Sequence, residues 1–296
     1  MFQHVSVIGA GTMGNGIAHV FAQHGFTTHL IDIDQQKLDN ALATITKNLD
    51  RQISKQAISE AEKQSTLQNI QIHTNLAAGV SQSGLIIEAA TENTELKLKI
   101  FKQLDELAPT DCILATNTSS ISITKIASAT KRPDKVIGMH FMNPVPVMKL
   151  VEVINGYATG KKTTEVIIEL SKQLNKIPCI ANDYPGFVAN RILMPMINEA
   201  IYSLQEGVAN VAAIDTIMKL GMAHPMGPLQ LADFIGLDVC LNILRVMQEG
   251  FGNPKYAPCP LLVNMVTAGS LGIKSGEGFY VYEKGRKDLL VSPRFA

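Results

Sequence analysis

A glycine-rich segment near the start of the chain constrains its fold more than any other feature. The segment reads Gly9, Ala10, Gly11, Thr12, Met13 and Gly14, which is the pattern G-x-G-x-x-G. A short apolar run, residues 5–8, precedes it, and a helical stretch to about Gln23 follows it. In this context the pattern predicts a strand–turn–helix unit that binds the pyrophosphate of a dinucleotide. The alternative is a glycine-rich turn without a ligand.

The second predicted strand, residues 27–31, ends at Asp32, and this position predicts which dinucleotide is bound. A carboxylate at the end of that strand accepts hydrogen bonds from the ribose hydroxyls of adenosine. It also repels a 2′-phosphate, so we expect NAD to be preferred over NADP. Asp34 lies slightly further on and is the alternative, but the strand-end position favours Asp32.

The first two-thirds of the chain alternates between strand and helix patterns. Further apolar strands are predicted at residues 85–89, 113–116, 136–141 and 150–154, with a helix at 95–108 and a long polar helical region at about 35–65. Continuous apolar strands separated by helices predict a parallel sheet buried on both faces. Near Asp183 the pattern changes and stays helical to about Ser270. We therefore expect an α/β Rossmann-type doubly wound sheet in residues 1–184, followed by an all-α C-terminal domain in residues 185–296.

The predicted helical domain carries many apolar residues. Ile192, Met196, Ala200 and Leu204 form one apolar stripe, and residues 229–247 are apolar around much of a helix. A helix that is apolar on all sides must be buried on all sides. We expect this burial to occur in a homodimer, because monomers rarely expose large apolar patches. Burial against the first domain is the alternative.

The composition excludes several classes of protein. The chain has 26 basic and 26 acidic residues, which argues against a nucleic-acid partner. No apolar run reaches the roughly 18 residues that a membrane helix needs, so we expect no membrane association. The histidines lack metal-ligand spacing, which predicts that no metal is bound. The cysteines, Cys112, Cys179, Cys240 and Cys259, form no CxxC pair, so we expect reduced thiols in a cytoplasmic protein.

Two polar residues in apolar strands are candidates for acid–base chemistry. His140 lies at the end of the strand 136–141, and open α/β sheets bind ligands at the carboxyl ends of their strands. A structural histidine is the alternative for such a residue. Glu152 lies inside the apolar strand 150–154, where an unpaired carboxylate would be unfavourable. We therefore expect Glu152 to pair with His140 as an acid–base couple.

Several motifs together resemble one known family. They are the segment 9–14, the run Met139-His140-Phe141-Met142-Asn143-Pro144, the run Asp183-Tyr184-Pro185-Gly186-Phe187-Val188-Ala189-Asn190-Arg191, and the segments 224–228 and 274–280. In this combination they are similar to the L-3-hydroxyacyl-CoA dehydrogenases, and most of all to the short bacterial 3-hydroxybutyryl-CoA dehydrogenases. The resemblance covers essentially the whole chain. It implies an acyl-CoA substrate and reversible oxidation of an (S)-3-hydroxyacyl-CoA to the 3-oxoacyl-CoA, with NAD as the hydride acceptor.

The resemblance also implies roles for individual residues. His140 matches the catalytic histidine and Glu152 matches its carboxylate partner. Ser119 and Asn190 match residues that bind the reacting oxygen, and Asn143 lies in the loop beside the histidine. For the cofactor, the family pattern implies Gly9, Ala10, Gly11, Thr12, Met13, Gly14, Asp32, Glu92, Lys97, Asn117, Ser119, Asn143 and Lys274. We expect Lys55 to contact a phosphate of CoA, although a lysine in a polar helix more often faces only solvent.

Two other functions are open on the sequence alone. A dehydrogenase of the same fold would act on a free hydroxy acid or sugar acid, without CoA. A structural or sensory module would bind NAD and lack a catalytic pair. The presence of His140, Glu152, Ser119 and Asn190 disfavours the second alternative. Because Asn190 belongs to the helical domain, we expect the two domains to close over the substrate.

Overall fold

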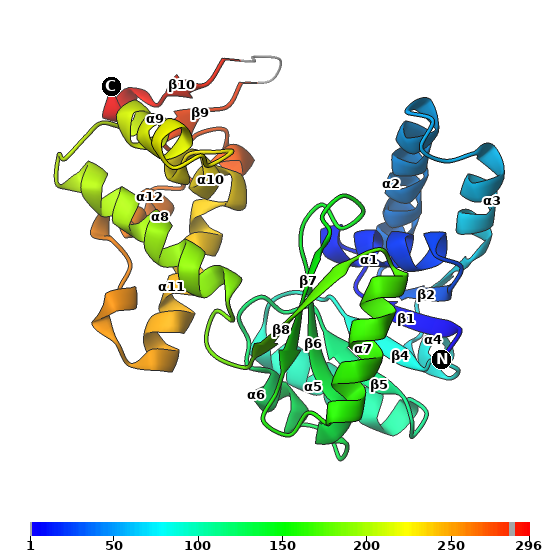
Figure 1. The fold of residues 1–296 in the computed structure, drawn as a ribbon. Coiled ribbons are helices and arrows are strands. Elements are labelled where there is room, and N and C mark those ends of the chain that lie inside the picture. The colour runs from blue at the N-terminus through cyan, green and yellow to red at the C-terminus, as the bar shows by residue number, and fades with distance from the viewer. Residues whose placement is uncertain (1, 284–287) are drawn as a thin grey trace. The chain divides into compact units, whose positions relative to one another are not determined.

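The computed structural model of the chain describes residues 2–283 and 288–296. It divides into two compact units, Met1–Tyr184 and Pro185–Ala296, each with a hydrophobic core of its own. The first unit is a sheet with helices on both faces, and the second is mainly helical (Figure 1). The predicted fold class, a Rossmann-type sheet followed by a helical C-terminal domain, is confirmed.

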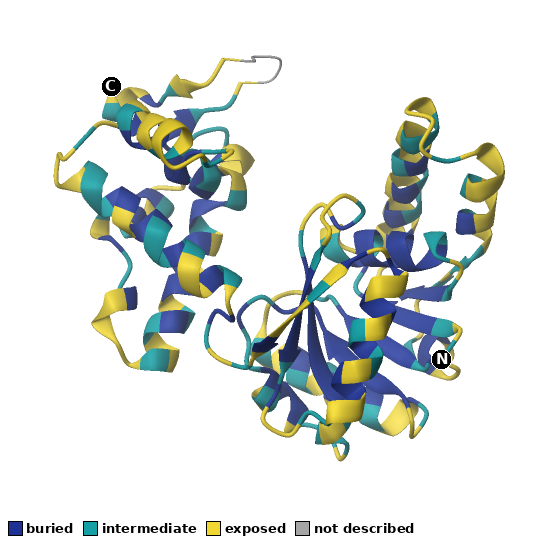
Figure 2. Cartoon of the chain, in the orientation of Figure 1, coloured by how far each residue is buried: buried dark blue, intermediate teal, exposed yellow. Residues whose placement is uncertain are grey.

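The first unit alternates strands and helices. Its strands are β1 (His4–Ile8), β2 (Thr27–Ile31), β3 (Ile70–His73), β4 (Leu85–Glu88), β5 (Ile113–Thr116), β6 (Val136–Phe141), β7 (Leu150–Asn155) and β8 (Ile177–Asn182). Its helices are α1 (Thr12–Gln23), α2 (Gln35–Ser54), α3 (Glu60–Gln68), α4 (Leu76–Val80), α5 (Thr94–Leu107), α6 (Ile123–Ala127), the 3-10 helix Pro133–Lys135 and α7 (Lys161–Gln173). In Figure 1, α7 lies in front of the sheet, and α5 and α6 lie behind it. Because both faces are covered, β4, β5 and β6 are buried along their whole length (Figure 2).

All of these strands belong to one eight-stranded sheet, in the order β3-β2-β1-β4-β5-β6-β7-β8. The strands from β3 to β6 are parallel, whereas β7 runs antiparallel to β6 and β8 is parallel to β7. The prediction of a parallel sheet is therefore wrong at β7. The loop 142–149 joins β6 to β7 without a crossover helix, so the chain can only return antiparallel to β6. This return places Glu152 directly opposite His140.

The sequence pattern does not indicate the two edge strands of the sheet. Residues of β3 are half-buried or exposed, and β8 has one buried residue, Ala181. Edge strands bury less of their surface, so they need no continuous apolar run. The polar region 35–65 is also two helices rather than one. Ser59 begins α3 with a capping box to Glu62, and Gln56 turns the chain before it with a φ of +56°.

The second unit contains five α-helices within its described residues. They are α8 (Ala189–Gln205), α9 (Val211–Gly221), α10 (Pro228–Ile235), α11 (Leu237–Phe251) and α12 (Pro260–Thr267). Short 3-10 helices lie at Pro254–Tyr256, Ile273–Ser275 and Pro293–Phe295, and β9 (Tyr280–Val281) pairs with β10 (Leu290–Val291). In the described parts of both units, no helix is long and apolar enough to cross a membrane.

The apolar segment 229–247 is not one helix but two. Gly236, with a φ of +103°, separates α10 from α11, and a glycine tolerates this conformation better than other residues. Residues on both helices, such as Leu229 and Leu244, are buried in the core of the second unit itself. A single copy of this unit therefore buries much of the segment that was expected to require a partner.

The apolar stripe expected on α8 is also different in the structure. Ile192 is 68% exposed, so the predicted stripe is wrong at this residue. The fully buried apolar side chains of α8 are Met194, Ile197 and Ile201. They recur at helical spacing and pack in the core of the second unit.

Candidate active site

The candidate residues of the first unit gather at one edge of its sheet. The glycine-rich turn follows β1, Asp32 follows β2, and Glu92 follows β4. Ser119 follows β5, and His140 lies near the end of β6. Since these strands are parallel, their carboxyl ends meet at the same edge. Glu152 joins them because the antiparallel β7 begins there.

The glycine-rich turn has the shape that a pyrophosphate site requires. Gly9 has a φ of +98°, and a Cβ there would lie 2.7 Å from the Ala89 carbonyl oxygen, so the position requires glycine. A Cβ on Gly14 would collide with the carbonyl of Gly9. A Cβ on Gly11 would meet no atom within 4 Å, so Gly11 faces open space at the start of α1. The N–H groups at a helix start of this kind are suited to bind phosphate groups.

Asp32 and Asp34 differ in the bonds that they make. The Asp32 carboxylate accepts hydrogen bonds from the backbone N–H groups of Ala10 (2.9 Å) and Asp34 (3.1 Å). Asp34 is the N-cap of α2 and accepts from the N–H of Gln36 (2.9 Å). Of the two, Asp32 is therefore the one that lies against the glycine-rich turn, while Asp34 begins a helix.

His140 and Glu152 form a buried pair across β6 and β7. The two residues are direct partners in the strand register, and Nδ1 of His140 lies 2.7 Å from Oε2 of Glu152. Their exposed fractions are 9% for His140 and 4% for Glu152. A buried carboxylate requires a donor, so Glu152 favours the imidazole tautomer with its proton on Nδ1. In that neutral tautomer, Nε2 is the ring nitrogen without a proton.

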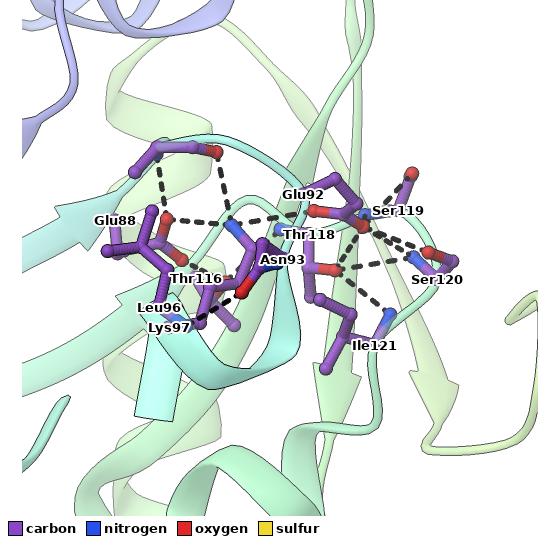
Figure 3. Close-up of polar contacts among 11 residues, drawn as sticks. Glu88, Glu92, Asn93, Leu96, Lys97, Thr116, Thr118, Ser119, Ser120 and Ile121 are labelled. Carbon is purple, nitrogen blue, oxygen red and sulfur yellow. Dashed lines mark hydrogen bonds and ion pairs between the residues drawn. The ribbon is translucent and has the colours of Figure 1, made fainter. Parts of the chain in front are cut away.

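Glu92 organises the loop that carries Ser119 (Figure 3). Its Oε1 atom accepts from the Thr118 hydroxyl (2.5 Å), the backbone N–H of Ser119 (3.0 Å) and the hydroxyl of Ser120 (3.0 Å). Burial alone raises the pKa of this carboxyl, but Lys97 and these hydrogen bonds outweigh burial and hold the pKa below its ordinary value. Glu92 is therefore ionised at neutral pH and fixes the backbone at Ser119.

Lys97, expected at the cofactor, lies inside the protein. Its side chain is 1% exposed, and Nζ lies 2.7 Å from Oε1 of Glu88, which is wholly buried (Figure 3). Nζ also donates to the carbonyl of Ala90 (3.3 Å) and lies 3.4 Å from Oε2 of Glu92. The other Glu88 oxygen accepts from the Thr116 hydroxyl (2.8 Å). Lys97 thus acts on Glu92 as a buried counter-charge. A direct contact of Lys97 with the cofactor stays a prediction.

Glu88 is a polar residue of this network that no motif indicates. It ends β4 inside the apolar run 85–89. The argument that predicts a partner for Glu152 applies here too, because a carboxylate in a strand buried on both faces requires a donor or a cation. That signal predicts a buried pair but does not identify Lys97 as the partner.

Asn117 and Asn143 both lie at the carboxyl edge of the sheet. Oδ1 of Asn117 accepts from the backbone N–H of Phe141 (2.9 Å) and so joins the end of β5 to the end of β6. Asn117 is 9% exposed. Asn143 is exposed in the loop 142–149 that follows β6. Asn117 is thus placed to hold the strand end next to His140.

Three further candidate residues lie on helices or at a helix end. Asn190 is buried in the first turn of α8, and Lys274 lies in the 3-10 helix Ile273–Ser275, both in the second unit. Nζ of Lys274 lies 2.5 Å from Oδ1 of Asp238. Lys55 is exposed at the C-terminal end of α2. The roles expected for these residues stay predictions.

In the part of the chain that the structure describes, the cysteines and the metal-ligating side chains form no second reactive or metal-binding site. Each cysteine is a free thiol, and burial raises the pKa of Cys112 and of Cys240 to about 12. These two thiols are therefore protonated and unreactive at neutral pH. Among the described residues, no three histidine, cysteine or carboxylate side chains are arranged to hold a metal ion.

The sequence matches two family models. The NAD-binding domain of 3-hydroxyacyl-CoA dehydrogenase matches residues 4–184, and the C-terminal domain of 3-hydroxyacyl-CoA dehydrogenase matches residues 186–282. The two matches meet where the structure divides into its two units.

Individual proteins are similar over nearly the whole chain. A Bradyrhizobium diazoefficiens protein named 3-hydroxybutyryl-CoA dehydrogenase is 52% identical over 289 residues, which are 98% of this chain and 98% of the relative. The human mitochondrial hydroxyacyl-coenzyme A dehydrogenase is 43% identical, over 95% of this chain and 91% of the relative. The crystal structure of (S)-3-hydroxybutyryl-CoA dehydrogenase from Ralstonia eutropha is similar with a TM-score of 0.93 and 49% identity, covering 96% of this chain and 100% of that chain.

Proposed function

Because the chain belongs to the 3-hydroxyacyl-CoA dehydrogenase family, we propose that its substrate pair is (S)-3-hydroxybutyryl-CoA and acetoacetyl-CoA. The chain is an NAD-dependent 3-hydroxyacyl-CoA dehydrogenase. Relatives about half identical to it that are named for the four-carbon substrate support the choice of acyl group. The observation that carries the reaction is the buried contact between Nδ1 of His140 and Oε2 of Glu152.

The proton transfer is assigned to Nε2 of His140. In oxidation this atom takes the proton of the 3-hydroxyl group, and in reduction it returns the proton to the forming alkoxide. Bound NAD supplies the remaining chemistry, which is acceptance or return of the hydride at C3. Glu152 stabilises the imidazolium, because a buried carboxylate close to Nδ1 is poorly screened by water.

Ser119 and Asn190 are proposed to donate hydrogen bonds to the reacting oxygen. Such a donor contributes roughly 2–4 kcal/mol to the transition state in comparable sites. The fixed backbone of Ser119 supports this role, because Glu92 accepts its N–H (3.0 Å). The role of Asn190 rests on its position in the family motif. Asn143 is proposed to orient groups around His140.

The glycine-rich turn, residues 9–14, is proposed to bind the pyrophosphate of NAD. Asp32 is proposed to bind the adenosine ribose and to disfavour NADP, which the contact of its carboxylate with the Ala10 N–H supports. The remaining proposed cofactor residues are Glu92, Lys97, Asn117, Ser119, Asn143 and Lys274.

The substrate proposal is tested with purified protein, NADH and a panel of substrates. Acetoacetyl-CoA is expected to consume NADH faster than longer 3-oxoacyl-CoA thioesters, and free acetoacetate is expected to be inactive. Turnover of the free acid at the rate of the thioester would contradict the CoA requirement. Faster turnover of a longer thioester would contradict the four-carbon assignment alone.

Lys55 is proposed to contact a phosphate of CoA, which its exposed position at the end of α2 permits. Lys55→Ala is expected to raise the KM for the thioester several-fold with little change in kcat. This split is the signature of binding that is equally strong in the ground state and the transition state. Steady-state kinetics decide the matter, and an unchanged KM would remove Lys55 from the site.

The chain is further proposed to be a cytoplasmic homodimer. The free thiols are consistent with a reducing compartment. Support for the dimer comes from apolar side chains on α9 and the turn after it. Ile217 is 58% exposed, Leu220 is 81% exposed and Met222 is 60% exposed. Neighbouring exposed apolar residues of this kind are typical of an association surface.

A further inference from the structure

Lys176 makes contacts that the catalytic pair does not account for. It lies between α7 and β8 and is 8% exposed. Its Nζ atom donates to the carbonyl oxygens of Val145 (2.5 Å) and Met148 (2.7 Å). Both carbonyls belong to the loop 142–149, the segment that joins the strand of His140 to the strand of Glu152.

The partners of Lys176 are unusual for a buried cation. Burial lowers the pKa of its ammonium below the ordinary value, with no opposing effect from a carboxylate among the described residues. A buried charge is unfavourable unless hydrogen bonds or an opposite charge compensate it. Here two backbone carbonyls supply the compensation. The lysine in turn donates hydrogen bonds to carbonyls of a loop that lies outside the sheet.

The same loop also packs on α1. Val145 is 2% exposed, and a Cβ on Gly16 would lie 2.9 Å from its Cβ. Gly16 is in the second turn of α1, two residues after the end of the glycine-rich segment. Within the loop, the N–H groups of Val147 (3.0 Å) and Met148 (2.9 Å) both donate to the carbonyl of Pro144. The loop is therefore a compact turn that contacts both α1 and Lys176.

We propose that Lys176 is a positioning residue for the dehydrogenase reaction, which clamps the loop 142–149 through two carbonyls and so sets the place of Asn143 and His140 relative to the glycine-rich turn. The clamp acts through the loop and not on the substrate. Its consequence for catalysis rests on the proposed function, whereas its effect on the loop does not.

Two substitutions and one control isolate the clamp. Lys176→Met keeps most of the length of the side chain and removes both hydrogen bonds. Lys176→Arg keeps the charge and offers several donors. Lys172→Met is the matched control, because Lys172 lies nearby in the last turn of α7, is 57% exposed and pairs with Glu169 (2.6 Å). Lys176→Gln serves if the methionine variant does not fold.

The first measurement follows the loop without using activity. Hydrogen–deuterium exchange of a peptide that covers residues 142–149 is expected to accelerate in Lys176→Met. The amides of Val147 and Met148 report directly, because they bond within the turn. Lys172→Met is expected to match the parent protein. Unchanged exchange in Lys176→Met would overturn the clamp, including in a protein that proves to lack the proposed activity.

The second measurement follows catalysis. We expect Lys176→Met to lower the kcat for acetoacetyl-CoA reduction at least tenfold per NADH-binding site, and Lys176→Arg to recover part of the loss. The isotope effect on kcat with NADH deuterated at the transferred hydrogen is expected to increase, because the chemical step slows. A merely structural role lowers the active fraction and leaves this isotope effect unchanged. A parent-like kcat, or a loss with an unchanged isotope effect, would overturn the positioning role.

Discussion

At the scale of single residues, the proposed acid–base pair rests on one contact of 2.7 Å between His140 and Glu152. Glu152→Gln keeps the shape of the side chain and removes the charge that is proposed to stabilise the imidazolium. We expect kcat to fall by roughly 10²–10⁴-fold, the usual contribution of general acid–base catalysis. NADH binding should survive, since neither residue belongs to the glycine-rich turn. Steady-state kinetics and NADH titration measure both effects.

The double variant tests whether the two side chains act as a unit. His140→Ala should cost about as much as Glu152→Gln, and the two together should be little worse than either alone. Additive losses would mean that Glu152 acts independently of His140. A near-normal kcat in Glu152→Gln would make Glu152 a structural carboxylate.

At the scale of elements, the pair of Glu88 and Lys97 joins β4 to α5 with both side chains almost wholly inaccessible. Lys97→Met removes the cation and leaves a buried carboxylate without its counter-charge. Breaking one partner of a buried pair costs about 3–5 kcal/mol, whereas replacing both partners costs much less. We expect the free energy of unfolding, measured with urea, to fall by that amount in the single variant.

The double variant Glu88→Gln with Lys97→Met is the informative comparison. It should recover a large part of the lost stability, because no buried charge is left without a partner. Lys99→Met, an exposed position on the same helix, is the control and should leave the stability nearly unchanged. A single variant as stable as the control would contradict the ion pair as a source of stability.

At the scale of the whole molecule, stability is expected to depend on pH through His19. This residue on α1 is wholly inaccessible, and burial lowers its pKa from 6.5 to about 4. Between those values the unfolded chain binds the proton and the folded chain does not. The contribution of His19 to the free energy of unfolding is therefore fully present above pH 6.5. It is lost as the pH falls toward 4, by about 3 kcal/mol in total.

Asp233 has the opposite effect on the pH dependence of stability, because burial raises its pKa to about 6. The measurement must therefore separate His19 from Asp233. We therefore compare urea unfolding of the parent and of His19→Gln from pH 7 to pH 4. The difference in stability should change across this range by the amount assigned to His19. Parallel pH profiles for the two proteins would show that His19 does not titrate as its burial predicts.

The proposed homodimer is also a property of the whole molecule, and its mass in solution tests it. A homodimer would have twice the chain mass of 32.1 kDa in sedimentation equilibrium. Leu220→Asp places a charge on the most exposed apolar side chain of α9 and should shift the equilibrium toward monomer. Lys219→Asp, an exposed polar neighbour, is the control. A parent protein that sediments at 32.1 kDa at micromolar concentration would contradict the dimer.

Features that depend on local geometry and burial could be predicted from the amino-acid sequence. Only glycine tolerates the backbone of Gly9, so the turn after β1 could be read directly from the chain. A carboxylate in an apolar strand demands a partner, and this requirement predicted the pairing of Glu152 with His140. The alternation of buried strands with helices likewise predicted a Rossmann-type sheet, because strands covered on both faces must be apolar throughout.

Features that depend on which distant surfaces meet could not be predicted from the amino-acid sequence. The antiparallel return of β7 follows from a connection without a helix, and the apolar pattern of a strand does not reveal its direction. The partner of Glu88 is a lysine on another element, and the loop carbonyls that Lys176 binds lie about 30 residues away in the sequence. The burial of a polar group predicts that the group has a hydrogen-bond or ionic partner. The folded arrangement decides which group satisfies it.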